Sequence, residues 1–157
     1  MISRCKAVQI AVAMLIFSFA YADEILKVKS ADEAMRSSLV YLRDHSSGNV
    51  PGGDTRWQEK TIFSDGPIDL VTTSKQFTSD SWIIEVSQNL APLRNIVYQV
   101  ILFSSKDGWY WKGSIKADGT IKEETPFTQL SVDEKQKIAG ELLRKSRIPP
   151  PAGGYGH

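Results

Sequence analysis

Side chains able to do chemistry are sparse in this chain. Its two histidines are His45 and His157, and its only cysteine is Cys5. Asp44 precedes His45, but neighbouring residues on a helix point in different directions, so the two are not arranged as a base with an orienting carboxylate. No serine stands in a G-x-S-x-G or S-x-x-K motif, and no phosphate-binding glycine motif occurs. The sequence therefore favours a protein without a catalytic centre.

The acidic side chains show no spacing typical of a metal site. Asp54, Asp65 and Asp69 lie in neighbouring predicted loops. Their spacing is neither that of a calcium-binding loop nor that of a recognisable carboxylate pair. Turn formation accounts for these residues, and we predict no metal and no cofactor.

The most distinctive chemical feature is the aromatic run Trp109, Tyr110 and Trp111. Side chains alternate in direction along a strand, so the two tryptophans share one face and Tyr110 lies on the other. The tryptophans could stack on a sugar or a peptide, or they could pack in the core beneath a helix. The second arrangement is favoured.

The face that carries Tyr110 holds further large apolar residues on neighbouring predicted strands. If a C-terminal helix leaves these side chains uncovered, they form an exposed apolar patch, which usually marks a partner surface. We therefore predict a contact surface for a protein or peptide partner, called the apolar patch below: Ile83, Ile101, Phe103 and Tyr110.

Residues 1–22 have the organisation of a secretory signal peptide. Arg4 and Lys6 form a basic start, residues 7–20 are almost wholly apolar, and residues 20–22 (Ala-Tyr-Ala) are an A-x-A cleavage site. The apolar run is shorter than the ~20 residues that span a bilayer. We therefore expect no stable membrane span after cleavage. An uncleaved N-terminal anchor is the alternative.

Cleavage after Ala22 would leave 135 residues without a cysteine. Removing Arg4 and Lys6 leaves 17 basic against 18 acidic residues, so the net charge changes from +1 to −1. That charge disfavours nucleic-acid binding, which depends on basic side chains. The chain also lacks an N-x-S/T sequon. These features predict a periplasmic or secreted bacterial protein that is held by its core rather than by disulfides.

Two capping boxes and several alternating segments outline the secondary structure. Ser30 and Glu33 begin a helix over residues 30–45, and Ser131 and Glu134 begin a second helix. Apolar alternation and turn residues predict four or five strands between them, among residues 56–64, 68–73, 81–88, 95–104, 109–116 and 121–123. Residues 149–157 are rich in Pro and Gly and are expected to be a disordered tail.

Consecutive strands joined by short turns form an antiparallel meander. We therefore predict a single α+β domain over residues 23–148. In it an N-terminal helix packs on a four- to five-stranded antiparallel meander, and a C-terminal helix follows. Residues 95–104 are apolar on both faces and need cover on both sides of the sheet. The C-terminal helix is the natural candidate for the second cover.

The order of a helix at 30–45 and strands at 82–86, 97–100 and 109–121 resembles the cystatin-like and PepSY-like α+β modules of exported bacterial proteins. The resemblance covers residues 30–124 and implies a helix on an antiparallel meander. PepSY-like modules have been linked to binding or inhibiting peptidases, but no residue here carries that role over. The sequence Gln-Val-Ile-Leu at 99–102 departs from the cystatin Q-x-V-x-G hairpin, and no Pro-Trp hairpin occurs, so protease inhibition is not implied.

A second resemblance is to the NTF2-like cone, whose late strands often carry Gly-Trp, as residues 108–109 do. It implies a small-molecule binder or enzyme with a pocket lined by Trp57, Trp82, Trp109 and Trp111. The leading prediction is an exported, non-enzymatic binding or interaction module of the bacterial envelope or periplasm, and the NTF2-like protein is the alternative. The identity of the partner and the oligomeric state stay open.

Overall fold

The computed structural model describes residues 27–63, 73–89 and 96–147. The predicted leader at 1–22 and the predicted tail at 149–157 lie outside the described residues, as does most of the strand expected at 68–73. None of the described helices is long and apolar enough to cross a membrane.

The first helix, α2 (Ala31–His45), forms where its capping residues and apolar spacing predict it. The Ser30 hydroxyl accepts a hydrogen bond from the backbone N–H of Glu33 and caps the N-terminus. Apolar and small residues three and four positions apart form one buried stripe, which contains Ala34, Met35, Ser38, Leu39 and Leu42. The predicted helix over residues 30–45 is confirmed.

Six strands follow in a single antiparallel sheet whose spatial order equals the chain order. Their bounds are β1 (Gln58–Phe63), β2 (Thr73–Ser79), β3 (Trp82–Asn89), β4 (Val97–Ser104), β5 (Trp109–Lys116) and β6 (Ile121–Gln129). The antiparallel meander is confirmed, but it has six strands rather than four or five. Alternation failed to reveal β2 because that strand carries polar side chains on both of its faces around Phe77.

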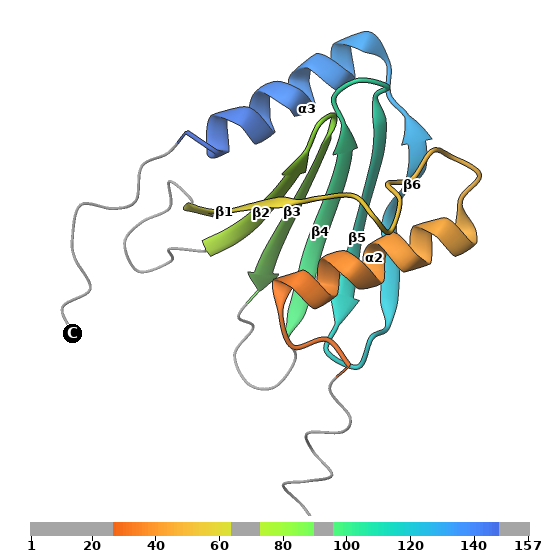
Figure 1. Ribbon diagram of the computed structural model, residues 1–157, viewed down its shortest axis with the longest axis vertical. Coiled ribbons are helices and arrows are strands. Elements are labelled where there is room, and N and C mark those ends of the chain that lie inside the picture. Colours follow the sequence, from red (N-terminus) through yellow and green to blue (C-terminus); the bar gives the residue numbers. More distant parts are fainter. Residues whose placement is uncertain (1–26, 64–72, 90–95, 148–157) are drawn as a thin grey trace, which may run out of the picture.

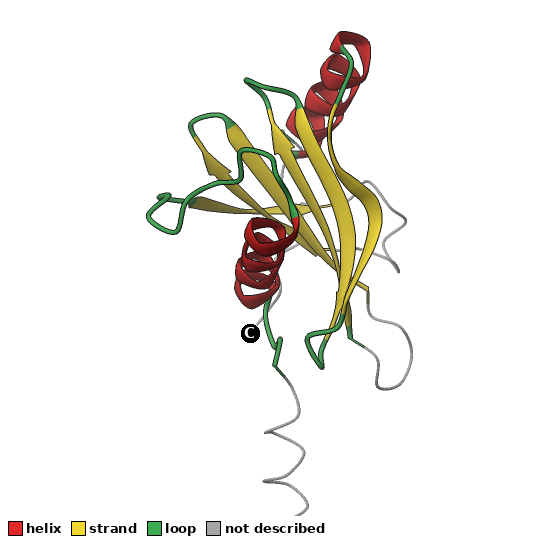
Figure 2. Ribbon diagram, turned by 90° about the vertical axis from the view of Figure 1, so that its right-hand side faces the viewer, coloured by secondary structure: helices red, strands yellow, loops and turns green. Residues whose placement is uncertain are grey.

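Two helices cover opposite faces of this sheet. The main core lies under α2 and contains alternate residues of the central strands, among them Ile84, Leu102 and Trp111. The intervening residues Ile83 and Phe103 face the other way and pack against α3 (Val132–Lys145). Figure 1 shows α2 crossing the middle of the strands and α3 running across one end. Figure 2 shows the sheet curving around α2.

The core under α2 includes a close fit between an indole ring and a glycine. Trp111 is fully buried, and its Nε1–H donates a hydrogen bond to Glu123 Oε2 at 2.8 Å. A Cβ on Gly113, two residues further along β5, would lie 2.4 Å from Cζ2 of that indole. The glycine therefore provides the space in which the ring lies. This confirms the core position expected for Trp111.

The second helix, α3, is well capped but lightly buried. Ser131 and Glu134 form a complete reciprocal capping box, as predicted. Along the helix, Leu142 is the single buried residue. Gly140 lies in the helix interior with no atom within 4 Å of the position its Cβ would take. No packing contact therefore compensates for the low helix propensity of glycine there.

The two glycines predict opposite effects of the same substitution. Gly113→Ala should lower the free energy of unfolding by about 1–3 kcal/mol, because the new methyl group overlaps the Trp111 ring. Gly140→Ala should raise it by up to about 1 kcal/mol, since alanine favours a helix and meets no neighbour. Chemical denaturation followed by tryptophan fluorescence measures both values. Equal effects of the two substitutions would contradict this account of the core.

Candidate functional site

The predicted apolar patch lies beneath α3 and is not an open surface. Phe103 is 0% and Ile83 is 8% exposed. Ile101 and Tyr110 are half-buried at the margin of the helix. The four residues do come together, because Ile83, Phe103 and Tyr110 are direct neighbours across β3, β4 and β5. The condition for an exposed patch, that the C-terminal helix leaves it uncovered, is not met, because Leu142 of α3 covers its centre. The role of these residues as a contact surface stays a prediction.

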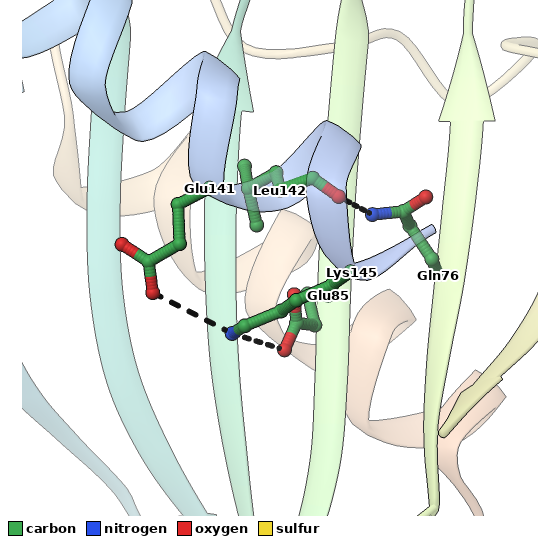
Figure 3. A network of polar contacts seen from close by, with 5 residues as sticks. All are labelled: Gln76, Glu85, Glu141, Leu142 and Lys145. Atoms are coloured by element: carbon green, nitrogen blue, oxygen red, sulfur yellow. Dashed lines mark hydrogen bonds and ion pairs between the residues drawn. The ribbon is translucent and has the colours of Figure 1, made fainter. Parts of the chain in front are cut away.

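A polar network joins α3 to the sheet beside this patch (Figure 3). Lys145 Nζ lies 3.0 Å from Glu85 Oε1 and 3.8 Å from Glu141 Oε1. Gln76 Nε2–H donates to the carbonyl of Leu142 at 3.3 Å. The Glu85 side chain is only 6% exposed, and its Oε2 has no hydrogen-bond partner among the described residues. The contact is therefore charged and incompletely satisfied.

A cavity of about 200 Å³ lies between α3 and the sheet next to this network. It is lined in part by Ile101, Tyr110 and Lys112 of the sheet and by Ile138 and Lys145 of the helix. Burial raises the pKa of the Tyr110 phenol, opposed by the neighbouring Lys112 ammonium. Lys112 itself forms an ion pair with Glu124 at 2.9 Å, and this contact raises the pKa of the lysine and lowers that of the carboxyl.

The four tryptophans of the alternative interpretation do not line one pocket. Trp111 lies in the core, and Trp109 stacks on the ring of Phe127 with centroids 4.9 Å apart. Trp57 and Trp82 border two different surface hollows. The part of the chain that the structure describes therefore lacks the closed aromatic pocket expected for an NTF2-like small-molecule site.

The first of these hollows lies between α2 and the start of β1, and we call it the α2–β1 hollow. Its volume is about 640 Å³. The apolar part of its lining is Met35, Leu39, Val40, Trp57 and Phe77, and the charged part is Asp32, Arg36, Arg43 and Glu59.

The charged groups of the α2–β1 hollow differ in how far they are already paired. Lys75 bridges Glu59 at 2.5 Å and Asp32 at 3.8 Å, and the hydrogen bond that its ammonium donates to Glu59 raises the pKa of the lysine. Arg43 donates from Nε and Nη2 to the carbonyl of Pro51. The exposed guanidinium of Arg36 has no ion pair or hydrogen bond among the described residues. A ligand that pairs with Arg36 therefore breaks no interaction among the described residues.

The second hollow has a volume of about 880 Å³ and lies on the other side of β1, toward the end of α3. Its lining includes Arg56, Gln58 and Thr78 from the first two strands and their approach, together with Ala139 and Leu143 from α3. Consecutive residues of β1 therefore border different hollows: Glu59 lines the first and Gln58 the second.

Strand β1 between the two hollows is an edge of the sheet. Among the described strands its single neighbour is β2, and Gln58 to Thr61 are exposed. Edge strands usually carry devices that prevent pairing with another chain. On the opposite edge, β6 contains Pro126 and three successive charged residues, Lys122 to Glu124. Strand β1 has no proline, and both of its charged side chains are engaged within the chain: Glu59 pairs with Lys75, and Lys60 donates to the carbonyl of Ser146.

Sequence reasoning did not find the two hollows. Their walls come from α2, the loop before β1, β2 and the β2–β3 turn, which are far apart in the chain. The available signal was Trp57, an aromatic residue within the segment predicted as a strand at 56–64. Among the described residues, no group of three or more His, Cys, Asp or Glu side chains could hold a metal ion.

No family model, curated protein or solved structure matches the chain. The likeness to cystatin-like, PepSY-like and NTF2-like proteins therefore stays a prediction. The functional interpretation depends on the geometry of the chain itself.

The raised pKa of Tyr110 predicts how stability falls in alkali. The folded state holds the phenol proton more firmly than the unfolded chain. This contribution is fully present below the unfolded pKa of about 10 and is lost as the pH rises through the folded pKa. Tyr110→Phe should therefore show a shallower alkaline decline in denaturation measured between about pH 8 and 11. Parallel declines would show that the phenol is not shielded by α3.

Proposed function

We propose that this protein is an exported, non-enzymatic interaction module of the bacterial envelope or periplasm, and that its partner contributes an extended segment that adds to the edge strand β1. The observation that carries the proposal is the exposed β1, which has one strand neighbour among the described residues and a hollow on either side. An added strand places alternate side chains on opposite faces. The two hollows lie where those side chains would go.

In strand addition the backbone and the side chains of the added segment have separate roles, and this site suits both. Main-chain hydrogen bonds provide affinity at an open edge, and pockets for alternate side chains provide specificity. The α2–β1 hollow offers an apolar floor that includes Phe77 and Met35, and its lining includes Arg36, which has no ion pair with any other described residue. The segment that suits it is extended and presents an apolar and an acidic side chain to this hollow.

Selection of random peptides on the purified chain tests the site, with Arg36→Glu as the critical variant. Selected peptides should bind Arg36→Glu about tenfold more weakly, a loss that corresponds to ~1.4 kcal/mol of binding free energy. Fluorescence anisotropy of a labelled peptide measures the affinity. Lys122→Glu is the matched control, because it makes the same charge change on β6 at the far edge of the sheet.

Hydrogen exchange locates the bound peptide independently of the variants. The amides of β1 that face away from β2 should become protected when a selected peptide binds, while those of β6 stay unchanged. Equal affinities for wild type and Arg36→Glu, or protection of β6 in place of β1, would contradict the proposed site.

Export is tested on native material. The leader predicts that the protein recovered from its source organism begins at Asp23, and mass spectrometry of the intact chain measures this directly. A soluble cytosolic form that retains Met1 would contradict the export prediction and leave the β1 site to be judged by peptide binding alone.

A further inference from the structure

The contact between α3 and the sheet differs from the contact between α2 and the sheet. Helix α2 buries a stripe of five residues, whereas α3 buries Leu142 alone. Ile138 and Ala139 pack only partly against the same cluster, and Val132 and Leu143 are 70% and 48% exposed. The sheet is therefore held chiefly from the α2 side.

Two features of α3 oppose stable attachment. Gly140 weakens the helix at its middle and makes no compensating contact. At its C-terminal end, Lys145 neutralises the buried Glu85, but Oε2 of that carboxylate is left without a partner. An unpaired buried polar atom is costly, and release of α3 would return it to water.

The surface under α3 does not depend on α3 for its shape. Ile83, Phe103 and Tyr110 lie on β3, β4 and β5, whose other faces form the main core under α2. Removing α3 would uncover the apolar patch while leaving that core in place. An amphipathic helix with the apolar spacing of residues 138, 139 and 142 would then be the natural occupant of the patch.

We propose that α3 detaches from its own sheet and docks on the sheet of a second copy, so that two chains exchange this helix. The apolar patch already accommodates α3, and the basic Lys145 pairs with the acidic Glu85 beside it. The connection from β6 to α3 is only Leu130 and Ser131. Short connections favour exchange of an element between copies over its return to the same copy. This inference concerns the α3 face of the sheet and is independent of the α2–β1 hollow, whereas Ala139 and Leu143 of α3 also line the second hollow.

Charge reversal at the Glu85–Lys145 pair provides a direct test. Glu85→Lys and Lys145→Glu each create a like-charge contact within their own chain. When the two variants are mixed, exchange of α3 restores opposite charges at both docking sites. We expect each variant alone to be monomeric and the equimolar mixture to form a heterodimer, measured by light scattering after size exclusion. A mixture that remains monomeric would overturn the proposal.

Two controls separate exchange of α3 from other association. The double variant Glu85→Lys/Lys145→Glu restores the pair within one chain and should be monomeric. Adding Leu142→Asp to both members of the mixture should abolish the heterodimer, because Leu142 is buried in the patch, whereas Leu143→Asp should not, because Leu143 is exposed. Equal effects of the two aspartates would place the dimer contact elsewhere and refute the exchange.

Hydrogen exchange of the wild-type chain tests the detachment step even if a charge-reversed variant fails to fold. The amides of α3 should exchange at least 100-fold faster than those of β4, because α3 opens without unfolding of the core. Gly140→Ala should slow exchange within α3 while leaving that of β4 unchanged. Exchange of α3 and β4 at the same rate would show that the helix leaves only when the whole domain unfolds, and would overturn the proposal.

Discussion

The fold depends on strand β4 having apolar side chains on both faces. Its residues alternate between the core under α2, where Val100 and Leu102 are fully buried, and the opposite face, where Phe103 is fully buried. A sheet whose central strand is apolar on both sides is stable in water only when both sides are covered. One helix before the meander and one after it meet this requirement. The order of elements along the chain follows from it.

Helix α2 buries more residues against the sheet than α3 does. The difference follows from how far the apolar residues extend on each face of the sheet. On the α2 side, apolar residues continue from β2 to β5, through Phe77, Ile84, Leu102 and Trp111, so a helix with five buried positions has a continuous surface to cover. On the α3 side, the row next to the apolar patch is mostly polar and contains Gln76 and Glu85. A helix crossing that boundary can bury one leucine and must neutralise a carboxylate. The polar row therefore limits how firmly α3 is held.

Local sequence signals predicted the elements that depend on local interactions. Both helices begin at their capping serines, and the predicted segments 81–88, 95–104 and 109–116 correspond closely to β3, β4 and β5. Strand β2 was missed because pairing between β1 and β3, rather than its own alternation, determines its conformation. Strand β6 continues six residues beyond the predicted end at Glu123, through Pro126, which an edge strand tolerates. The four patch residues lie together, and α3 covers the second face of β4, as the doubly apolar residues 95–104 predicted, so the patch is largely buried.

The polar side chains that prevented the prediction of β2 continue in β1 and account for the exposed edge there. Strand β1 extends the sheet beyond most of the apolar residues that the two helices cover. It is held by its hydrogen bonds to β2, by the contact of Lys60 with the carbonyl of Ser146 and by the buried side chain of Ile62. A strand held in this way exposes its outer backbone groups and leaves hollows on both faces where the helices diverge from the sheet. The polar sequence of β1 therefore leaves this edge of the sheet exposed.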